Sequence, residues 1–395
     1  MISVISQCRF AVHHDPIATT HKTEEDPMTP RRPSRLFTLF TTLLAWAAVL
    51  FAAPSVQASD DSPISKLVES WLISPHANYH SPSFTYWNKE GEVPKACATC
   101  HSETGFRDFL GADGSAAGSI EQPGVINAPI GCASCHTEAA HALDAVRFPS
   151  GAEVGGLGSS ATCTVCHQGR QSGAAVTKAV GTLGEDEVSG ELSFINIHYA
   201  VAAATMHGAD TASGYHYPGK TYAGRFQHVP SANSCVACHD PHTTKVAEDG
   251  CASCHRGVES IRDIRMRHAD FDGDGDIREG VHGEIGTLHE RLHDAIKVYG
   301  EAVLGAPIGY HKNRHPYFFG DMNGDGVIGD EEAVRDNAYK AWTPRLLKAA
   351  YNYQVVAKDP AGYVHNPAYL LQLLYDSLES LSSAVEIDMA RFSRP

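Results

Sequence analysis

Cys97-Ala-Thr-Cys100-His101 is the first of five Cys-x-x-Cys-His motifs that decide how this chain folds. The other four are Cys132-Ala-Ser-Cys135-His136, Cys163-Thr-Val-Cys166-His167, Cys235-Val-Ala-Cys238-His239 and Cys251-Ala-Ser-Cys254-His255. The spacing is typical of covalent c-type haem attachment, because two thiols three positions apart can form thioethers with the two vinyl groups of one porphyrin. The histidine that follows is then held under the iron as its proximal ligand. The sequence therefore predicts five covalently attached c-type haems.

Two other uses of paired cysteines compete with haem attachment. Cys-x-x-Cys pairs can hold zinc, and cysteines of exported proteins usually form disulfides. Neither use explains why a histidine follows the second cysteine every time. Ten of the 11 cysteines fall in the five motifs, and Cys8 lies in a segment that we expect to be removed.

The amino terminus, residues 1–58, is predicted to be an export signal preceded by a mis-assigned extension. A basic region, Arg31, Arg32 and Arg35, follows Met28, and an apolar run occupies residues 36–53. Val56-Gln57-Ala58 then offers small residues at a cleavage position. The apolar run is long enough to span a bilayer, so a retained anchor is the alternative. Cleavage would leave an exported protein, periplasmic or at the outer surface, with no membrane span.

The charge balance is acidic, with 31 Lys and Arg residues against 46 Asp and Glu residues and a formal net charge of −15. Such a surface argues against binding nucleic acid or anionic lipid, and it favours basic partners or bound cations.

The fold is predicted to be mainly α with extensive loops. Residues 59–255 form a multihaem cytochrome c domain that is poor in long apolar runs, so we expect the haems to supply most of its core. Residues 256–395 form a helical section, because apolar residues recur at helical spacing over residues 285–303 and 370–381. Further helices are expected at residues 64–72 and at about 331–356, where Pro344 should kink or split the helix.

Two stretches of the helical section resemble EF-hand calcium loops. The loop at residues 321–332 fits at every diagnostic position, with glycine at position 6 and a carboxylate at position 12. Its predicted ligands are Asp321, Asn323, Asp325, Val327 and Glu332.

The loop at residues 270–281 begins equally well, with predicted ligands Asp270, Asp272, Asp274 and Asp276. It fails at position 12, where Val281 replaces the acid, and Glu279 or Glu284 are the candidate substitutes. Ile277 and Ile328 hold matching positions, so the two loops could pair through a short strand. The sequence thus predicts one or two calcium ions, as a static clamp or as a calcium-responsive switch.

The sixth ligand of each iron decides what that iron can do. A second histidine saturates the iron and makes it an electron carrier, whereas an open position allows catalysis. Residues 59–395 contain 15 histidines outside the five motifs, so every iron could have two. Sequence context selects five candidates for the distal position: His76, His198, His228, His242 and His365. His80, His141 and His268 are the reserves.

The chain resembles the exported multihaem c-type cytochromes of bacteria that respire metals and other external acceptors. The resemblance rests on the five motifs, on Phe-Ile-Asn-Ile-His-Tyr at residues 194–199, on Cys-His-Asp-Pro-His at residues 238–242 and on the tail at residues 341–353. It implies an electron carrier of the periplasm or outer surface, with redox proteins as partners. Some members stack into haem filaments, which implies possible self-association.

A rival resemblance is to the pentahaem nitrite reductases, which also carry five c-type haems, calcium and long carboxyl-terminal helices. Most of them use a Cys-x-x-Cys-Lys motif, which this chain lacks, and their calcium site is not an EF-hand. The leading hypothesis is therefore a pentahaem electron carrier of anaerobic or extracellular respiration. The alternatives are a reductase of a small nitrogen or sulfur oxyanion with one open iron, and a subunit of a haem filament.

Overall fold

The computed structural model describes residues 62–265 and 267–395, so the predicted export signal lies outside the described residues. The chain divides into two compact units, residues 1–72 and 73–395. In the first unit, α1 (Pro63–Leu72) matches the helix expected at residues 64–72. Across the described residues, every helix is too short or too polar to cross a bilayer.

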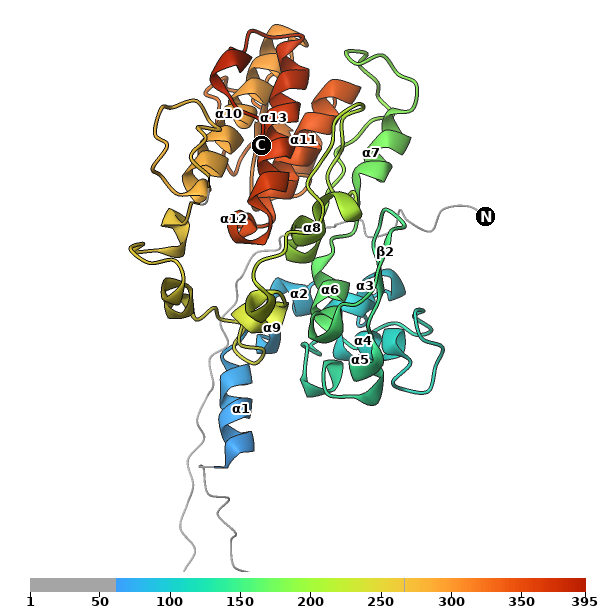
Figure 1. Ribbon diagram of the computed structural model, residues 1–395. Helices are drawn as coiled ribbons and strands as arrows, with labels where there is room; N and C mark the ends of the chain where they lie inside the picture. Colours follow the sequence, from blue (N-terminus) through green and yellow to red (C-terminus); the bar gives the residue numbers. More distant parts are fainter. Residues whose placement is uncertain (1–61, 266) are drawn as a thin grey trace, which may run out of the picture. The chain divides into compact units, whose positions relative to one another are not determined.

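The second unit begins with a series of short helices, three of which carry a Cys-x-x-Cys-His motif (Figure 1). These helices are α2 (Pro82–Thr85), α3 (Lys95–His101), α4 (Glu103–Leu110), α5 (Glu138–Ala142), α6 (Ala161–His167), α7 (Gly173–Val180), α8 (Ala202–His207) and α9 (Cys235–Cys238). Gly111, which has a φ of 69° in the left-handed region, ends α4. A small apolar cluster that includes Phe106, Phe148 and Val165 joins α4, α6 and the chain between them.

The main core is built on three long helices that lie side by side in Figure 1: α10 (Val281–Ala302), α11 (Pro344–Ala357) and α13 (Pro367–Ser382). Helix α12 (Gly362–His365) connects the last two. The buried face of α10 carries Leu288, Leu292 and Ile296, as the helical spacing predicts. Val176, Ile197 and other residues between the third and fourth motifs belong to the same core, so packing crosses the boundary that we expected near residue 255.

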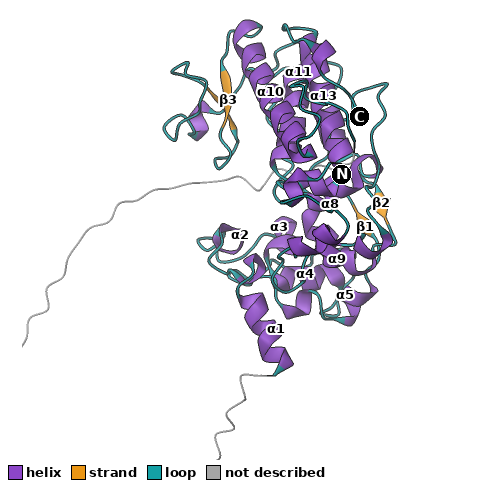
Figure 2. Ribbon diagram, turned by 60° about the vertical axis from the view of Figure 1, so that its left-hand side comes forward, coloured by secondary structure: helices purple, strands orange, loops and turns teal. Residues whose placement is uncertain are grey.

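The strands are few and short (Figure 2). Strand β1 (Val146–Arg147) pairs with β2 (Glu153–Val154), and β3 (Ile308–Tyr310) pairs with β4 (Phe318–Gly320), both antiparallel. The prediction of a mostly helical chain with extensive loops and little sheet is confirmed.

Two local expectations are wrong. The α-helix expected at about 331–356 begins only at Pro344, so this proline neither kinks nor splits a longer helix. It stands at the first turn of α11, where its missing N–H is not needed, and the Thr343 hydroxyl caps the helix by accepting from the Leu346 N–H at 3.2 Å. Ile277 and Ile328 do not pair either: Ile277 is 44 % exposed, whereas Ile328 packs with Phe319 and Ala333.

Candidate haem site

Each Cys-x-x-Cys-His motif lies on a single helical turn. Motifs one, three and four lie on α3, α6 and α9, and motifs two and five lie on 3₁₀ turns at Cys132–Ser134 and Glu248–Ser253. Residues three apart on a turn project to the same side. The two thiols of each motif therefore present a common face, as attachment to one porphyrin requires.

Thiols of different motifs also approach one another. The Cys100 sulfur lies 4.0 Å from the Val165 carbonyl oxygen, and the Cys166 sulfur lies 3.9 Å from that of Thr99, so the first and third motifs interlock. Hydrogen bonding to Cys235 raises the pKa of the Cys163 thiol, which joins the third motif to the fourth.

The fifth motif follows the fourth in space as well as in sequence. Burial raises the pKa of the Cys238 thiol, and the nearby Cys251 raises it further. Cys135 of the second motif likewise raises the pKa of the Cys163 and Cys166 thiols, so it lies near both. The third motif therefore lies near the first, second and fourth motifs, and the fifth lies near the fourth.

Four of the five motif histidines face a second histidine from another part of the chain. The ring centres are 5.8 Å apart for His101 and His198, 6.4 Å for His167 and His76, 6.2 Å for His136 and His242, and 6.0 Å for His255 and His228. All four partners are histidines that the sequence singles out for the distal position.

This separation matches the requirement of one iron held between two imidazoles. A transition-metal ion lies about 2 Å from an imidazole nitrogen, and the ring centre lies about 1 Å behind that nitrogen. Two rings on opposite sides of one iron therefore have centres about 6 Å apart. The four observed separations match this value.

The second motif has two candidate partners. The rings of His136 and His141 are also 6.2 Å apart, with an interplanar angle of 85°, whereas His136 and His242 are nearly parallel at 9°. His141 follows His136 by five residues on the same segment, and His242 approaches from the chain that follows the fourth motif. His242 is the better placed of the two to reach the opposite side of a porphyrin held by residues 132–136.

Backbone carbonyl groups orient three of the motif histidines. Nδ1 lies 2.9 Å from the Ser83 oxygen for His101, 2.7 Å from the Ala200 oxygen for His167, and 2.9 Å from the Thr244 oxygen for His239. A carbonyl oxygen can only accept, so Nδ1 donates and Nε2 is left as the metal-binding nitrogen.

Backbone strain coincides with these contacts. Ala200 and Thr244, which supply two of the accepting carbonyl groups, have φ values of 51° and 61°, and the distal candidate His198 has a φ of 94°. Such conformations are costly for residues with a side chain and concentrate at functional sites.

Burial keeps His198 in its neutral form. Together with the charges of the nearby His101, Arg170 and Lys358, burial lowers the pKa of this imidazole to about 3. The neutral imidazole is the form that binds metal ions.

The fifth distal candidate, His365, stands at the end of α12. Its Nδ1 lies 2.8 Å and 3.0 Å from the two carboxylate oxygens of Asp359. Cys235, the first thiol of the fourth motif, is near enough to raise the pKa of His365. Asp359 was not singled out from the sequence, where no pattern distinguishes it from other aspartates.

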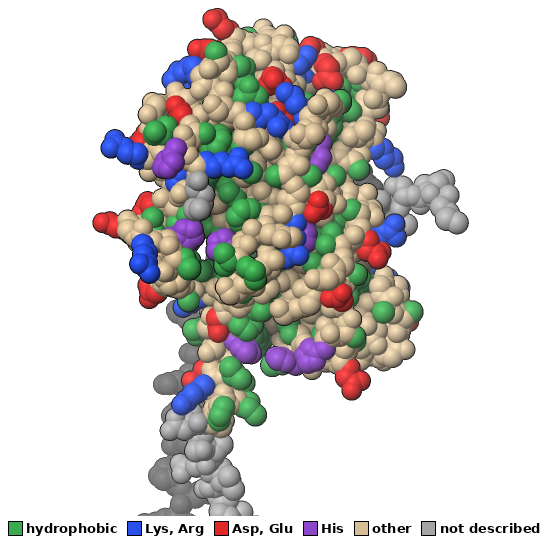
Figure 3. Space-filling model, viewed as in Figure 1, with side chains coloured by type: hydrophobic (Ala, Val, Ile, Leu, Met, Phe, Trp, Pro, Cys, Tyr) green, Lys and Arg blue, Asp and Glu red, His purple; other side chains and the backbone are tan. Residues whose placement is uncertain are grey.

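Apolar surface surrounds the fourth motif. Val229, Val236 and Val246 are 46 %, 39 % and 38 % exposed. Figure 3 shows histidine side chains reaching one face of the molecule at several points, among hydrophobic side chains. A large, flat, mostly apolar group bound between the histidine pairs would cover such surface, so the residues present fit haem.

The two predicted calcium loops share one hydrogen-bond pattern. The residue at position 1, Asp270 or Asp321, accepts from the N–H groups at positions 4 and 6, at 2.6 to 3.0 Å. The side chains at positions 3 and 5 accept in the same way from positions 5 and 7. The side-chain oxygens of each loop are thereby turned toward a common centre.

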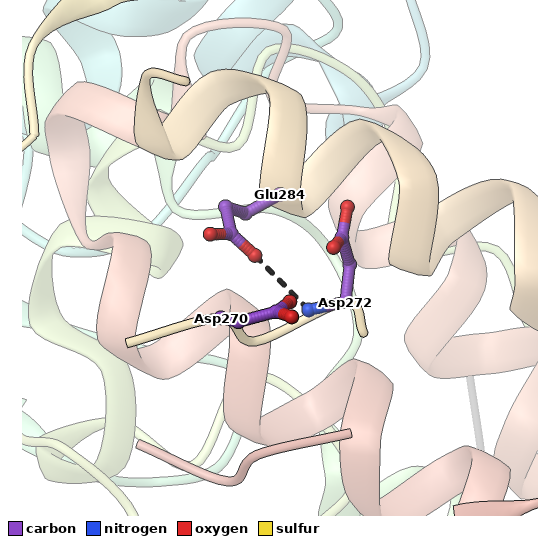
Figure 4. Close-up of side chains that lie close together, drawn as sticks. All are labelled: Asp270, Asp272 and Glu284. Carbon is purple, nitrogen blue, oxygen red and sulfur yellow. Dashed lines mark hydrogen bonds between the residues drawn. The ribbon is translucent and has the colours of Figure 1, made fainter. Parts of the chain in front are cut away.

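The acid that closes each loop also makes the same hydrogen bonds in both. Glu332 accepts from the N–H groups of Met322 and Asn323, at positions 2 and 3 of its loop. Glu284 accepts from those of Phe271 and Asp272, also at positions 2 and 3, at 2.8 and 3.0 Å. Figure 4 shows the bond from the Asp272 N–H. Ligand oxygens of Asp321, Asp325 and Glu332 lie within 4.8 Å of one another, as do those of Asp270, Asp272 and Glu284.

Comparison with known proteins finds relatives among polyhaem cytochromes. The chain is 27 % identical to the C-type polyheme cytochrome OmcC of Geobacter sulfurreducens, over 77 % of this chain and 45 % of the relative. It is 25 % identical to the C-type polyheme cytochrome OmcB of the same species, over 77 % of this chain and 46 % of the relative. The chain thus spans less than half the length of these relatives. No protein-family model matches the chain, and no solved structure does.

Proposed function

We propose that this chain is an exported c-type cytochrome that binds five haems covalently and transfers electrons along them. One observation carries the proposal: four motif histidines each face a second histidine at 5.8 to 6.4 Å. The likeness to polyhaem c-type cytochromes supports a multihaem electron-transfer protein. It also supports a role in extracellular respiration.

The residues of the chain have three tasks in this proposal. The cysteine pairs fix each porphyrin, and the motif histidine and its facing histidine occupy both axial positions. Hydrogen bonds from Nδ1 to the carbonyl groups of Ser83, Ala200 and Thr244 hold three of these imidazoles in place. Bound haem supplies the one-electron chemistry, and two histidine ligands exclude substrate from the iron.

The contacts between thiols suggest an order for the haems. Electrons would pass from the first haem through the third and fourth to the fifth, with the second haem beside the third. The fourth and fifth motifs are separated by 11 residues, so their haems form the closest pair along the sequence. His365 is the proposed distal ligand of the fourth haem, because it is the candidate next to Cys235.

Location and partners remain proposals that follow from the sequence. We propose that the protein acts in the periplasm or at the outer surface, with redox proteins as partners. The net charge of −15 favours a partner with a basic docking face. Assembly into filaments remains a hypothesis. Calcium at residues 321–332 also stays a prediction, with a structural clamp as its role.

A reductive titration tests the proposed function. The purified protein should contain about five haems per chain, and it should take up about five electrons per chain, because each motif holds one iron. Reoxidation by a ferric chelate should then return the same number of electrons. Fewer than five covalent haems, or haems that cannot be reoxidised by an external acceptor, would contradict the proposal. Catalytic consumption of nitrite or hydroxylamine by the reduced protein would favour the reductase alternative.

A further inference from the structure

Five carboxylates converge on the loop that precedes α10. Ligand oxygens of Asp270, Asp272 and Glu284 form one group within 4.8 Å, and those of Asp272, Asp274 and Glu279 form a second group that shares Asp272. Figure 4 shows Asp270 and Asp272 on the loop, facing Glu284 on the helix.

The positive charge of the chain does not balance these carboxylates. Arg265 is buried and pairs with Glu284, and it also donates to the carbonyl oxygen of Glu279 at 2.8 Å. Arg391 donates to the loop only at the Gly273 carbonyl group, at 3.0 Å. One paired arginine against five carboxylates leaves a large negative excess in a partly buried space.

Two oxygens in this cluster are buried and lack hydrogen-bond partners among the described residues. They are Oδ2 of Asp272 and Oε1 of Glu279. The Asp272 side chain belongs to a residue that is 2 % exposed, and its ligand oxygen lies with those of both groups. A buried carboxylate oxygen without a partner is costly, and a bound cation is the usual remedy.

We infer that this loop binds one calcium ion, with Glu284 as its closing acid in place of the residue at position 12. Asp270, Asp272 and Asp274 supply the oxygens of the loop, and Glu284 supplies the acid from the first turn of α10. Calcium is the cation that fits, because it accepts many oxygen ligands in irregular geometry, whereas Mg²⁺ demands a near-ideal octahedron and retains water.

The position of Glu284 explains how the loop closes despite Val281. Helix α10 begins at Val281, so Glu284 stands in its first turn and faces the loop. There it accepts from the N–H groups at loop positions 2 and 3, as Glu332 does in the loop that keeps the usual acid. Glu284 lies 14 residues after Asp270, whereas Glu332 lies 11 residues after Asp321. The two glutamates nevertheless close their loops in the same way.

This ion would fasten the chain that leaves the fifth haem motif. The Val281 N–H donates to the Ile264 carbonyl oxygen at 3.2 Å, and Gly280 packs so closely on Arg262 that a Cβ atom there would collide with its carbonyl oxygen. The loop is therefore bound to residues 261–265, which follow the fifth motif. Calcium binding would stabilise this junction.

Calorimetric titration of the haem-loaded, chelator-treated protein with CaCl₂ tests the inference. The exposed Asp325 is first changed to lysine, so that the loop at residues 321–332 cannot contribute. The remaining protein should bind about one calcium ion. Because direct ligands matter at least as much as the groups that support them, Glu284→Gln should weaken this binding by about 100-fold or more. Asp274→Asn should weaken it by about 10-fold.

Two controls make the result specific. Glu290→Gln makes the same charge change at an exposed position of α10 and should leave the calcium affinity unchanged. Asp274 is exposed, so its variant should keep the haem spectrum and the fold even if Glu284→Gln does not. The inference is overturned if the Asp325→Lys protein binds no calcium at millimolar concentration. It is also overturned if Glu284→Gln binds as tightly as its parent, or if MgCl₂ binds more tightly than CaCl₂. None of these outcomes bears on the haem proposal.

Discussion

Asp359 accepts a hydrogen bond from Nδ1 of His365, with 2.8 Å between the nitrogen and Oδ2. Both side chains are largely buried. A carboxylate that accepts from the far nitrogen of a metal-bound imidazole makes that imidazole a stronger electron donor. If His365 binds the fourth haem, Asp359 stabilises the ferric form and sets a low reduction potential for that haem.

Asp359→Asn should therefore raise the reduction potential of one haem by about 60 mV, which corresponds to a tenfold change for a one-electron couple. Spectroelectrochemical titration measures this as the shift of about one fifth of the absorbance change, since the chain has five motifs. Asp294→Asn, the same change at an exposed position of α10, is the matched control. Equal titration curves for the two variants would show that Asp359 does not tune a haem.

Removing one distal histidine should open one iron. His198→Ala leaves the first haem with His101 alone, and His76→Ala leaves the third haem with His167 alone. In each variant about one haem in five should bind carbon monoxide after reduction, because each histidine serves a single iron. His311→Ala is the control, since this histidine lies near Asp330 and is not a distal candidate. If neither distal variant gains a site for carbon monoxide, the pairing is wrong.

Two histidines, His141 and His242, are equally distant from His136 and compete for the distal position of the second haem. His242→Ala should create a site for carbon monoxide, whereas His141→Ala should not, because His141 shares a segment with the motif that would hold the porphyrin. Absorption spectra of the two reduced variants provide the measurement. The reverse result would assign His141 as the distal ligand and leave His242 without that role.

The ion pair of Asp186 and Arg345 should stabilise the helical section. Arg345 donates from Nε and Nη2 to the two carboxylate oxygens of Asp186, at 2.6 and 2.9 Å, and the Tyr299 hydroxyl donates to the same group at 2.7 Å. Asp186→Asn leaves the mostly buried guanidinium without its counter-charge. We expect it to lower the free energy of unfolding at pH 7 by about 1–2 kcal/mol, a figure reduced because Asp186 is 45 % exposed.

The pH dependence of this ion pair has a definite sign. Hydrogen bonding to Arg345 lowers the pKa of Asp186 below its usual value. A lowered carboxyl pKa contributes stability above the unfolded value of about 4 and loses it as the pH falls through the folded value. The difference between Asp186→Asn and the parent protein should therefore shrink below about pH 4. A difference that stays constant down to pH 2 in guanidinium titrations would rule out this origin.

The sequence predicts much of the candidate site because its chemistry follows fixed local spacing. The five attachment motifs are complete within five residues each, and the helical repeat of α10 and α13 is visible along the chain. Context also singles out His76, His198, His228 and His242, which the structure brings to four motif histidines. The sequence does not predict which motif each of these histidines serves. His76 and His167, for example, are 91 residues apart in the chain and meet only in the folded protein.

Other features depend on where an element begins. Pro344 is compatible with the middle of a kinked helix or with the first turn of a straight one, and the Thr343 cap decides for the latter. Similarly, the 12-residue EF-hand pattern that starts at Asp270 ends at Val281, so it does not include Glu284. Only the start of α10 at Val281 turns Glu284 back toward the loop. Asp359 shows the same limit, since a carboxylate near a histidine in sequence need not contact it.

Carbon monoxide binding to the reduced, calcium-replete protein tests the central claim most directly, because it reports whether any iron lacks a second axial ligand. With two histidines on every iron, the absorption spectrum of the dithionite-reduced protein should not change when carbon monoxide is added. A change equal to one haem in five or more would contradict bis-histidine ligation, and nitrite and hydroxylamine reduction would then be the activities to assay.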